Sequence, residues 1–485
     1  MMSSRMDDRD YGMISASLRE VTQDYMRKGI PLSLTLSIPC LGEVACGKVF
    51  RAIRGKRIAC LGSAGNTPVM VKLYFARFKA KRNWKRSDYG CRSFIERGIA
   101  APMILYSGYL SEYGVYALVL EYIDGGIRID EALDSIPEKE MRENLLDRLI
   151  ETLATHHAAG VLQNDLHMGN FLIKDGTIYS LDGDQVVCRA EALGRKRSLA
   201  NLTRLLASLP FPLADDLDAR IEAYVHARNW SISDTDKASL KDRVLGIRRR
   251  NLSGYLEKVL RSRDPFLASS RKGFYSVIDK RHLDVGLPEI LAASQRSMPA
   301  QGCLGRAGFR VFTVWGCDML SWSAYGAGPL VLKDLWNAVR VWKNALMLKR
   351  IGLVAPEPVA LALIKKLPFF WRCTVFFKPM GGKGLREFFD MPAIPEGEKN
   401  HIAAALTDAF ARLHAMGITA GRIDPESIMV SGSDIVFLKP AAFRRRIFSW
   451  RLKQSKMADR FISGCRDIPQ LMGLLTEHFK KRGLI

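Results

Sequence analysis

Asp165, Asn170 and Asp182 are side chains whose types and spacing could carry out phosphoryl transfer. Asp165 and Asn170 lie in one polar loop, and Asp182 follows two short apolar runs within residues 171–181. One carboxylate can orient an acceptor hydroxyl, while carboxylate and amide oxygens can hold Mg²⁺ on the phosphates of ATP. The loop therefore predicts a site for ATP and Mg²⁺.

The elements around this loop must bring its two ends together. Apolar residues at helical spacing from Leu145 to Leu153 predict a helix, and Gly160 is typical of its end. The pair Asp175-Gly176 between the two apolar runs predicts a hairpin. Its second strand should return Asp182 and Asp184 to the side of the loop.

The D-x-x-x-x-N spacing and the Asp after the next hairpin resemble the catalytic loop and metal site of protein kinases. The segments NDLHMGNFLI and LDGD resemble the corresponding motifs of sugar and antibiotic kinases, and look closest to those of bacterial lipopolysaccharide kinases. These act on inner-core heptose or 3-deoxy-manno-octulosonic acid. The resemblance covers most of residues 42–260 and, more faintly, 300–485. It implies that Asp165 is catalytic, that Asn170 and Asp182 hold the metal, and that Asp184 supports the metal or caps the following loop.

The chain before this loop alternates in the manner of β-strands, in the runs VACGKVFRA, RIACLG and PVMVKLYF. By the same resemblance, Lys72 at the end of the third run would hold the α- and β-phosphates of ATP. No G-x-G-x-x-G motif is present, so Gly55 and its neighbours would have to cover the phosphates.

Two further positions are implied for the nucleotide site. The helix before residues 98–102 should supply an acidic partner for Lys72; the family register gives Ser87, so we name the adjacent Asp88. The apolar run that ends at 121–126 resembles the segment whose backbone meets adenine, around Glu121 and Ile123.

Residues 410–440 repeat residues 153–183 without a gap at an offset of 257. An N-terminal match of PLVLK to PVMVK would place Lys333 on Lys72. At the fixed offset the paired residues are Asp165 and Arg422, Asn170 and Ser427, and Asp182 and Lys439. Cations would replace two carboxylates, which makes Mg-ATP chemistry there improbable. This pattern predicts a pseudokinase.

We therefore expect an α+β protein of two tandem, bilobal kinase-like domains, each with a β-rich N-lobe and a helical C-lobe. The expected boundaries are 1–41 for an N-terminal helical extension (a helix at 13–28), 42–260 for the active domain, 261–300 for a connector and 301–485 for the degenerate domain.

The net charge is +23, and residues 301–485 hold 28 Lys/Arg against 14 Asp/Glu. Such an excess favours anionic partners such as a membrane face or a phosphorylated glycolipid. The alternation of cations with Phe and Trp in residues 442–456 suits an interfacial helix, or equally a grip on substrate phosphates, or simply a solvated face. No nucleic-acid-binding pattern is seen, and none is expected as a partner.

The N-terminus lacks an apolar signal region, and no run approaches the roughly 20 apolar residues of a membrane span. Nine cysteines without paired spacing favour reduced thiols. We expect a cytoplasmic protein, peripheral on the inner membrane, that phosphorylates a sugar hydroxyl of lipopolysaccharide core or its lipid-linked precursor. The alternatives are a kinase of a protein or small soluble metabolite and a non-catalytic nucleotide-binding scaffold.

Overall fold

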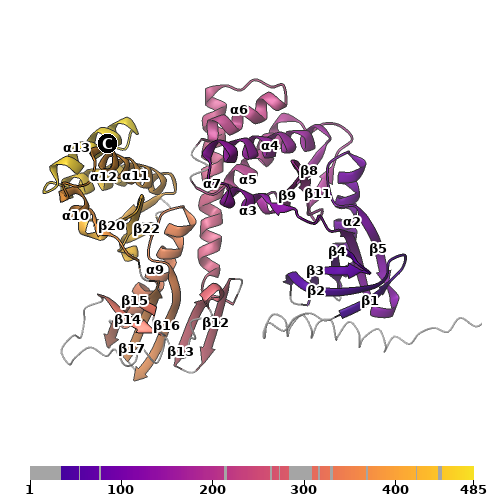
Figure 1. The fold of residues 1–485 in the computed structure, drawn as a ribbon, viewed down its shortest axis with the longest axis horizontal. Helices are drawn as coiled ribbons and strands as arrows, with labels where there is room; N and C mark the ends of the chain where they lie inside the picture. The colour runs from indigo at the N-terminus through magenta and orange to yellow at the C-terminus, as the bar shows by residue number, and fades with distance from the viewer. Residues whose placement is uncertain are drawn as a thin grey trace, which may run out of the picture. The chain divides into compact units, whose positions relative to one another are not determined.

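The computed structural model describes residues 34–53, 55–75, 78–211, 216–262, 265–271, 273–282, 308–314, 317–327, 331–367, 370–378, 380–421, 423–445 and 451–485. The helix expected at 13–28 lies outside these residues. The chain divides into two compact units (Figure 1). The first runs to residue 244 without residues 210–212, and the second takes those three residues with 245–485.

An antiparallel six-stranded sheet forms the N-terminal part of the first unit, in the order β1-β2-β3-β4-β6-β5. Alternation of side chains between its faces buries Val69, Val71 and Leu73 completely. The three strand runs predicted from the sequence are confirmed. The strands are β1 (Leu34–Ile38), β2 (Gly42–Ile53), β3 (Arg57–Ala64), β4 (Thr67–Tyr74), β5 (Ile104–Leu110) and β6 (Val115–Glu121).

Helix α2 (Ala80–Glu96) follows β4 and packs on this sheet (Figure 1). Its main contact is with β6. Its buried face includes Cys91 and Phe94, and Trp84 stacks on Tyr116 of β6. Helix α2 therefore covers the part of the sheet that β4, β6 and β5 form.

The helical part of the first unit is built around α4, whose leucines at helical spacing are buried. Gly160 follows the helix with φ +76°, as its predicted end requires. Asp175 and Gly176 both have positive φ, so β9 and β10 form a tight hairpin as predicted. The elements are β7 (Ile127–Arg128), α3 (Ile129–Ser135), α4 (Lys139–Ala158), β8 (Val161–Gln163), η2 (Met168–Asn170), β9 (Phe171–Lys174), β10 (Thr177–Ser180), β11 (Val186–Cys188), α5 (Arg195–Ser208), α6 (Leu217–Ala227) and α7 (Asp234–Lys258).

The second unit begins within α7 and also contains a six-stranded sheet, in the order β12-β13-β16-β17-β15-β14. Its last four strands pair with one another as β3 to β6 do in the first unit, with α9 in the place of α2. The first hairpin, however, joins the opposite edge, beside β16. The elements are β12 (Phe266–Arg271), β13 (Phe274–Asp279), β14 (Gly308–Val314), β15 (Cys317–Ala327), α9 (Val331–Arg350), β16 (Pro358–Leu367) and β17 (Phe370–Phe377).

Two expectations need correction here. Residues 266–279, expected within a connector, form the hairpin of this sheet, because β13 pairs along β16. Lys333, expected at the end of a strand, lies in the first turn of α9. The strand that corresponds to β4 by pairing is β15 instead, so the match of PLVLK to PVMVK does not reflect the fold.

Several of the remaining elements of the second unit recur at the predicted offset. Helix α11 and strands β19 to β22 begin and end 257 residues after α4, β8, β9, β10 and β11, with the same pairings. The described chain is thus mixed α+β, with a sheet and a helical part in each unit. These elements are β18 (Lys383–Gly384), α10 (Leu385–Asp390), α11 (Glu396–Ala415), β19 (Ile418–Ala420), η5 (Pro425–Ser427), β20 (Ile428–Ser431), β21 (Asp434–Phe437), η6 (Pro440–Ala442), β22 (Phe443–Arg445), α12 (Arg451–Gly464) and α13 (Pro469–Lys481).

Two buried histidines close the end of α4. His157 hydrogen-bonds through Nδ1 to the Tyr224 hydroxyl (2.6 Å) and through Nε2 to Asn201 Oδ1 (3.0 Å). Its neighbour His156 lies 3.3 Å from Ser180 Oγ. Burial lowers the pKa of His156 to about 3 and that of His157 to about 4. Both side chains are therefore neutral packing groups.

These pKa shifts predict that the first unit loses stability in mild acid. Between the unfolded pKa near 6.5 and the folded values, the unfolded state binds more protons, so the free energy of unfolding falls as pH falls, by about 1.4 kcal/mol per pH unit for each histidine. His157→Gln should flatten this dependence between pH 6.5 and 4 in denaturant titrations. Equal slopes for the variant and the wild type would contradict this assignment.

Candidate active site

The loop that carries Asp165 is held by hydrogen bonds to its neighbours. Asn170 donates through Nδ2 to the backbone oxygen of Asp165 (2.5 Å) and accepts at its own backbone oxygen from Leu181 N (2.9 Å). Gln163 donates to the backbone oxygen of Asp182 (2.9 Å). Asn170 is buried, while Asp165 is exposed. The Asp165 carboxylate is thus presented to solvent on a fixed loop.

Lys72 meets Asp182 across the site. Lys72 Nζ lies 3.5 Å from Asp182 Oδ1, and the two side chains are only 14% and 22% exposed. Burial by itself would lower the pKa of Lys72, but the Asp182 carboxylate and smaller contributions from Tyr74 and Cys91 hold it above its ordinary value. Strand β4 and the turn after β10 therefore bring the Lys72 ammonium and the Asp182 carboxylate together.

Asp184 lies next to this pair and has a partner of its own. Its backbone N donates to Asp182 Oδ1 (3.2 Å), and its Oδ2 forms an ion pair with the guanidinium of Arg57. Its other oxygen, Oδ1, is buried without a hydrogen-bond partner. Arg57 was not among the residues chosen from the sequence. Its position directly after the turn at Gly55, the segment expected to cover the phosphates, was the available signal.

The structure does not bring Asp88 to Lys72. Asp88 accepts from Arg92 Nε at 3.0 and 3.1 Å on the same helix, and Asp182 is the ion-pair partner of Lys72 among the described residues. The register position Ser87 is fully buried. The physical reason is the rotation of α2, which turns Asp88 along the helix surface and Ser87 toward the interior.

Glu121 and Ile123 lie at the end of β6 and in the turn that follows. Glu121 bonds with Met103 twice: its backbone N donates to Met103 O (2.8 Å), and its Oε2 accepts from Met103 N (3.2 Å). The Ile123 carbonyl accepts from Gly126 N (3.1 Å). These bonds fix the segment expected to meet adenine, whose role stays a prediction.

A contact between two glycines holds α2 against the turn that carries Asp182. A Cβ atom built on Gly90 would lie 2.0 Å from the backbone oxygen of Gly183. One built on Gly183 would lie 2.5 Å from Cys91 N and 2.7 Å from Ser87 O. Only glycine at both positions permits this approach, so the two chain segments on which the site depends meet backbone to backbone.

The residues present fit a magnesium ion bound together with a nucleotide. Asp182 offers a carboxylate, Asn170 uses its Nδ2 for the loop, and Asp184 holds a buried oxygen without a partner. The described residues contain no cluster of three or more His, Cys, Asp or Glu side chains. Mg²⁺ in nucleotide sites commonly takes one or two carboxylates and completes its shell with phosphates and water, so such a cluster is not required.

The corresponding position of the second unit carries a cation. Lys439 Nζ lies 3.0 Å from Asp424 Oδ1, and Ser427 Oγ donates to the same oxygen. Burial acts to raise the pKa of Asp424, but Ser427 and Lys439 together hold it below its usual value. The ammonium therefore neutralises this turn internally. Arg422 lies outside the described residues.

Residues 442–456 are the segment in which cations alternate with Phe and Trp, and its described residues do not share one environment. Phe443 lies in the core, since β22 pairs with β19, and Arg445 bonds to Ser253 Oγ. A continuous interfacial helix over 442–456 is therefore not present: strand β22 precedes α12. Among the helices that the structure describes, none has the length and apolar character needed to cross a membrane.

Comparisons with known proteins give little guidance. No family model matches the chain, and no curated protein matches it. Among solved structures it is similar to the kinase domain of Mycobacterium tuberculosis PknI in a double-mutant form (14% identity, TM-score 0.25, covering 36% of this chain and 72% of that one). It is also similar to vaccinia related kinase 3 (14% identity, TM-score 0.27, covering 50% and 95%). At such TM-scores these similarities carry no argument, so the functional assignment rests on the site.

The glycine contact predicts a large effect from a single methyl group. Gly90→Ala should lower the free energy of unfolding by roughly 1–3 kcal/mol or more, because the new Cβ has only backbone to displace. Gly254→Ala is the matched control: it also lies in a helix, and its Cβ would meet nothing within 4 Å. Chemical denaturation of both variants decides the matter; equal stability would contradict the close approach.

Proposed function

We propose that the first unit is an ATP- and Mg²⁺-dependent phosphotransferase with an alcohol group as acceptor. The observation that carries this proposal is the Lys72–Asp182 ion pair beside the loop of Asp165 and Asn170. Phosphoryl transfer requires mainly positioning and charge stabilisation, and this cluster offers a cation for phosphates, a carboxylate for the acceptor and oxygen ligands for a metal.

Each side chain has a distinct role in this proposal. Lys72 steadies the nucleotide phosphates, and exposed Asp165 orients the acceptor hydroxyl and accepts its proton. Asn170 and Asp182 would hold Mg²⁺, with Asp184 beside them. The metal, when bound, neutralises charge on the transferred phosphoryl group. The hydrogen bond from Asn170 Nδ2 to the backbone oxygen of Asp165 holds these two residues together.

For the acceptor we propose a sugar hydroxyl of the lipopolysaccharide inner core, at the cytoplasmic face of the membrane. The support is the sequence resemblance of the D-L-H-x-G-N loop and the net charge of +23, which favours an anionic glycolipid surface. A protein or a small soluble metabolite would use the same catalytic residues, and a nucleotide-binding scaffold would keep only the binding residues.

We propose that the second unit is a degenerate partner without phosphotransfer activity. Lys439 stands 257 residues after Asp182, and its ammonium pairs with Asp424. Ser427 stands at the position of Asn170 and donates to the same carboxylate. A metal ion at this turn would face a resident cation and would lose its anionic ligand.

Substitution of the loop carboxylate separates catalysis from binding. In the full chain, Asp165→Asn should reduce transfer from ATP by roughly 10²–10⁴-fold, as for loss of a general base, while nucleotide binding is kept. Asp182→Ala should weaken Mg-ATP binding itself. Calorimetry and transfer of labelled phosphate to dephosphorylated core glycolipid measure the two effects. The control is Asp175→Asn, since Asn accepts the positive φ of that turn. Wild-type turnover in both site variants would refute the assignment.

The acceptor is tested separately in cells. Core oligosaccharide from cells that lack this gene should contain less phosphate than that from parent cells, and the Asp165→Asn allele should not restore it. Mass spectrometry of the released core measures the difference. Unchanged core phosphate, with transfer activity lost in the purified variant, would favour a protein or a soluble metabolite as the acceptor.

A further inference from the structure

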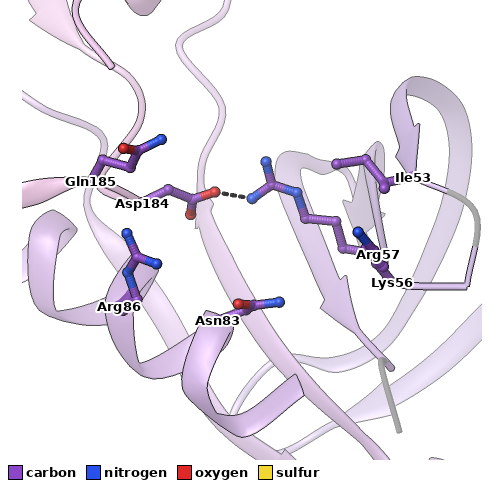
Figure 2. Close-up of a pocket in the computed structure, with 7 residues that line it drawn as sticks. All are labelled: Ile53, Lys56, Arg57, Asn83, Arg86, Asp184 and Gln185. Carbon is purple, nitrogen blue, oxygen red and sulfur yellow. Dashed lines mark hydrogen bonds and ion pairs between the residues drawn. The ribbon is translucent and has the colours of Figure 1, made fainter. Parts of the chain in front are cut away.

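Arg57 lies where a nucleotide's phosphates would be covered. It is the first residue of β3, directly after the turn in which Gly55 has φ +64°. From there its guanidinium reaches across to the Asp184 carboxylate (Figure 2). Both side chains are 20% exposed. The ion pair thus joins the tip of the sheet to the turn that carries Asp182.

The pocket around this ion pair is basic. Its lining residues are Ile53, Lys56, Arg57, Asn83, Arg86, Asp184 and Gln185, and its volume is about 190 Å³. In Figure 2 the side chains of Asn83 and Arg86 rise from α2 on the side facing Asp184. Neither Lys56 nor Arg86 forms an ion pair with a residue that the structure describes. Three cations therefore surround one carboxylate, and the pocket keeps a charge excess that suits a further anion.

The two carboxylates of the turn are held in the same manner. Lys72 from β4 pairs with Asp182, and Arg57 from β3 pairs with Asp184. The two aspartates are linked by the bond from Asp184 N to Asp182 Oδ1. The buried, unpartnered Oδ1 of Asp184 is an acceptor that lacks a cation or donor. The cations of β3 and β4 therefore neutralise both carboxylates of this turn.

We propose that Arg57 is a phosphate-binding residue that forms an ion pair with Asp184 when no nucleotide is bound. The terminal phosphates of the nucleotide take the place of the Asp184 carboxylate on Arg57, and Asp184 becomes available to the metal. This inference rests on the proposed function and adds to it a residue and an exchange of partners. It involves no covalent step, because only ion pairs are exchanged.

The exchange makes Arg57 act in opposite directions on two ligands. In the full chain, Arg57→Gln should weaken binding of Mg-ADP by roughly tenfold or more, as expected for loss of a charge-assisted hydrogen bond. The same variant should bind Mn²⁺ alone several-fold more tightly, because Asp184 has lost its competing cation. Calorimetry with Mg-ADP and electron paramagnetic resonance with Mn²⁺ measure the two affinities. Arg57→Lys, which keeps the charge, should lie between the wild type and Arg57→Gln in both.

The reciprocal variant and a control complete the test. Asp184→Asn should tighten binding of metal-free ADP, because it releases Arg57, and should weaken binding of Mn²⁺ alone. Arg51→Gln, an exposed position on β2 outside the pocket lining, should leave both affinities unchanged. Loss of both ligands in Arg57→Gln with a lowered melting temperature would show a structural role only and overturn the inference, as would unchanged affinities. If the wild type binds no nucleotide at all, the proposed function fails first.

Discussion

The contact between Gly90 and Gly183 is the constraint on which the first unit depends. Helix α2 packs on the sheet, and the turn at Gly183 follows the hairpin of β9 and β10. No side chain separates this helix from this turn. Because the flanking residues of that turn are Asp182 and Asp184, the contact fixes how far both carboxylates lie from the strands that supply Lys72 and Arg57. A methyl group at either glycine would therefore change these distances, although every side chain of the site would stay the same.

Carboxylates in both units are also neutralised by cations of the protein itself. Each unit pairs the carboxylate at its candidate site with a cation from the protein itself: Lys72 and Arg57 in the first, Lys439 in the second. The difference lies in where the cation originates. In the first unit both cations come from strands of the sheet, whereas Lys439 belongs to the turn after β21. Similar backbones therefore support opposite chemical expectations.

Much of the helical part of each unit could be predicted from the sequence, because its signals are local. The end of α4 at Gly160, the hairpin at Asp175-Gly176 and the return of Asp182 follow from short-range patterns of apolar residues and turn residues. The offset of 257 residues transferred these boundaries to α11 and β19–β22 without error.

Tertiary structure alone decided which side chains became partners and which strands became neighbours. Asp88 pairs with Arg92, Asp184 pairs with Arg57, and Lys333 lies in a helix. The hairpin at 266–279 joined the edge beside β16, where the first unit has no equivalent strand. The sequence by itself determined the local structure of the loop that carries Asp165 and Asn170, because its residues are close along the chain. The Arg57–Asp184 ion pair and the sheet edges join distant segments. These pairings, and the rotation of α2 that sets the surroundings of Asp88, depend on packing that local patterns do not specify.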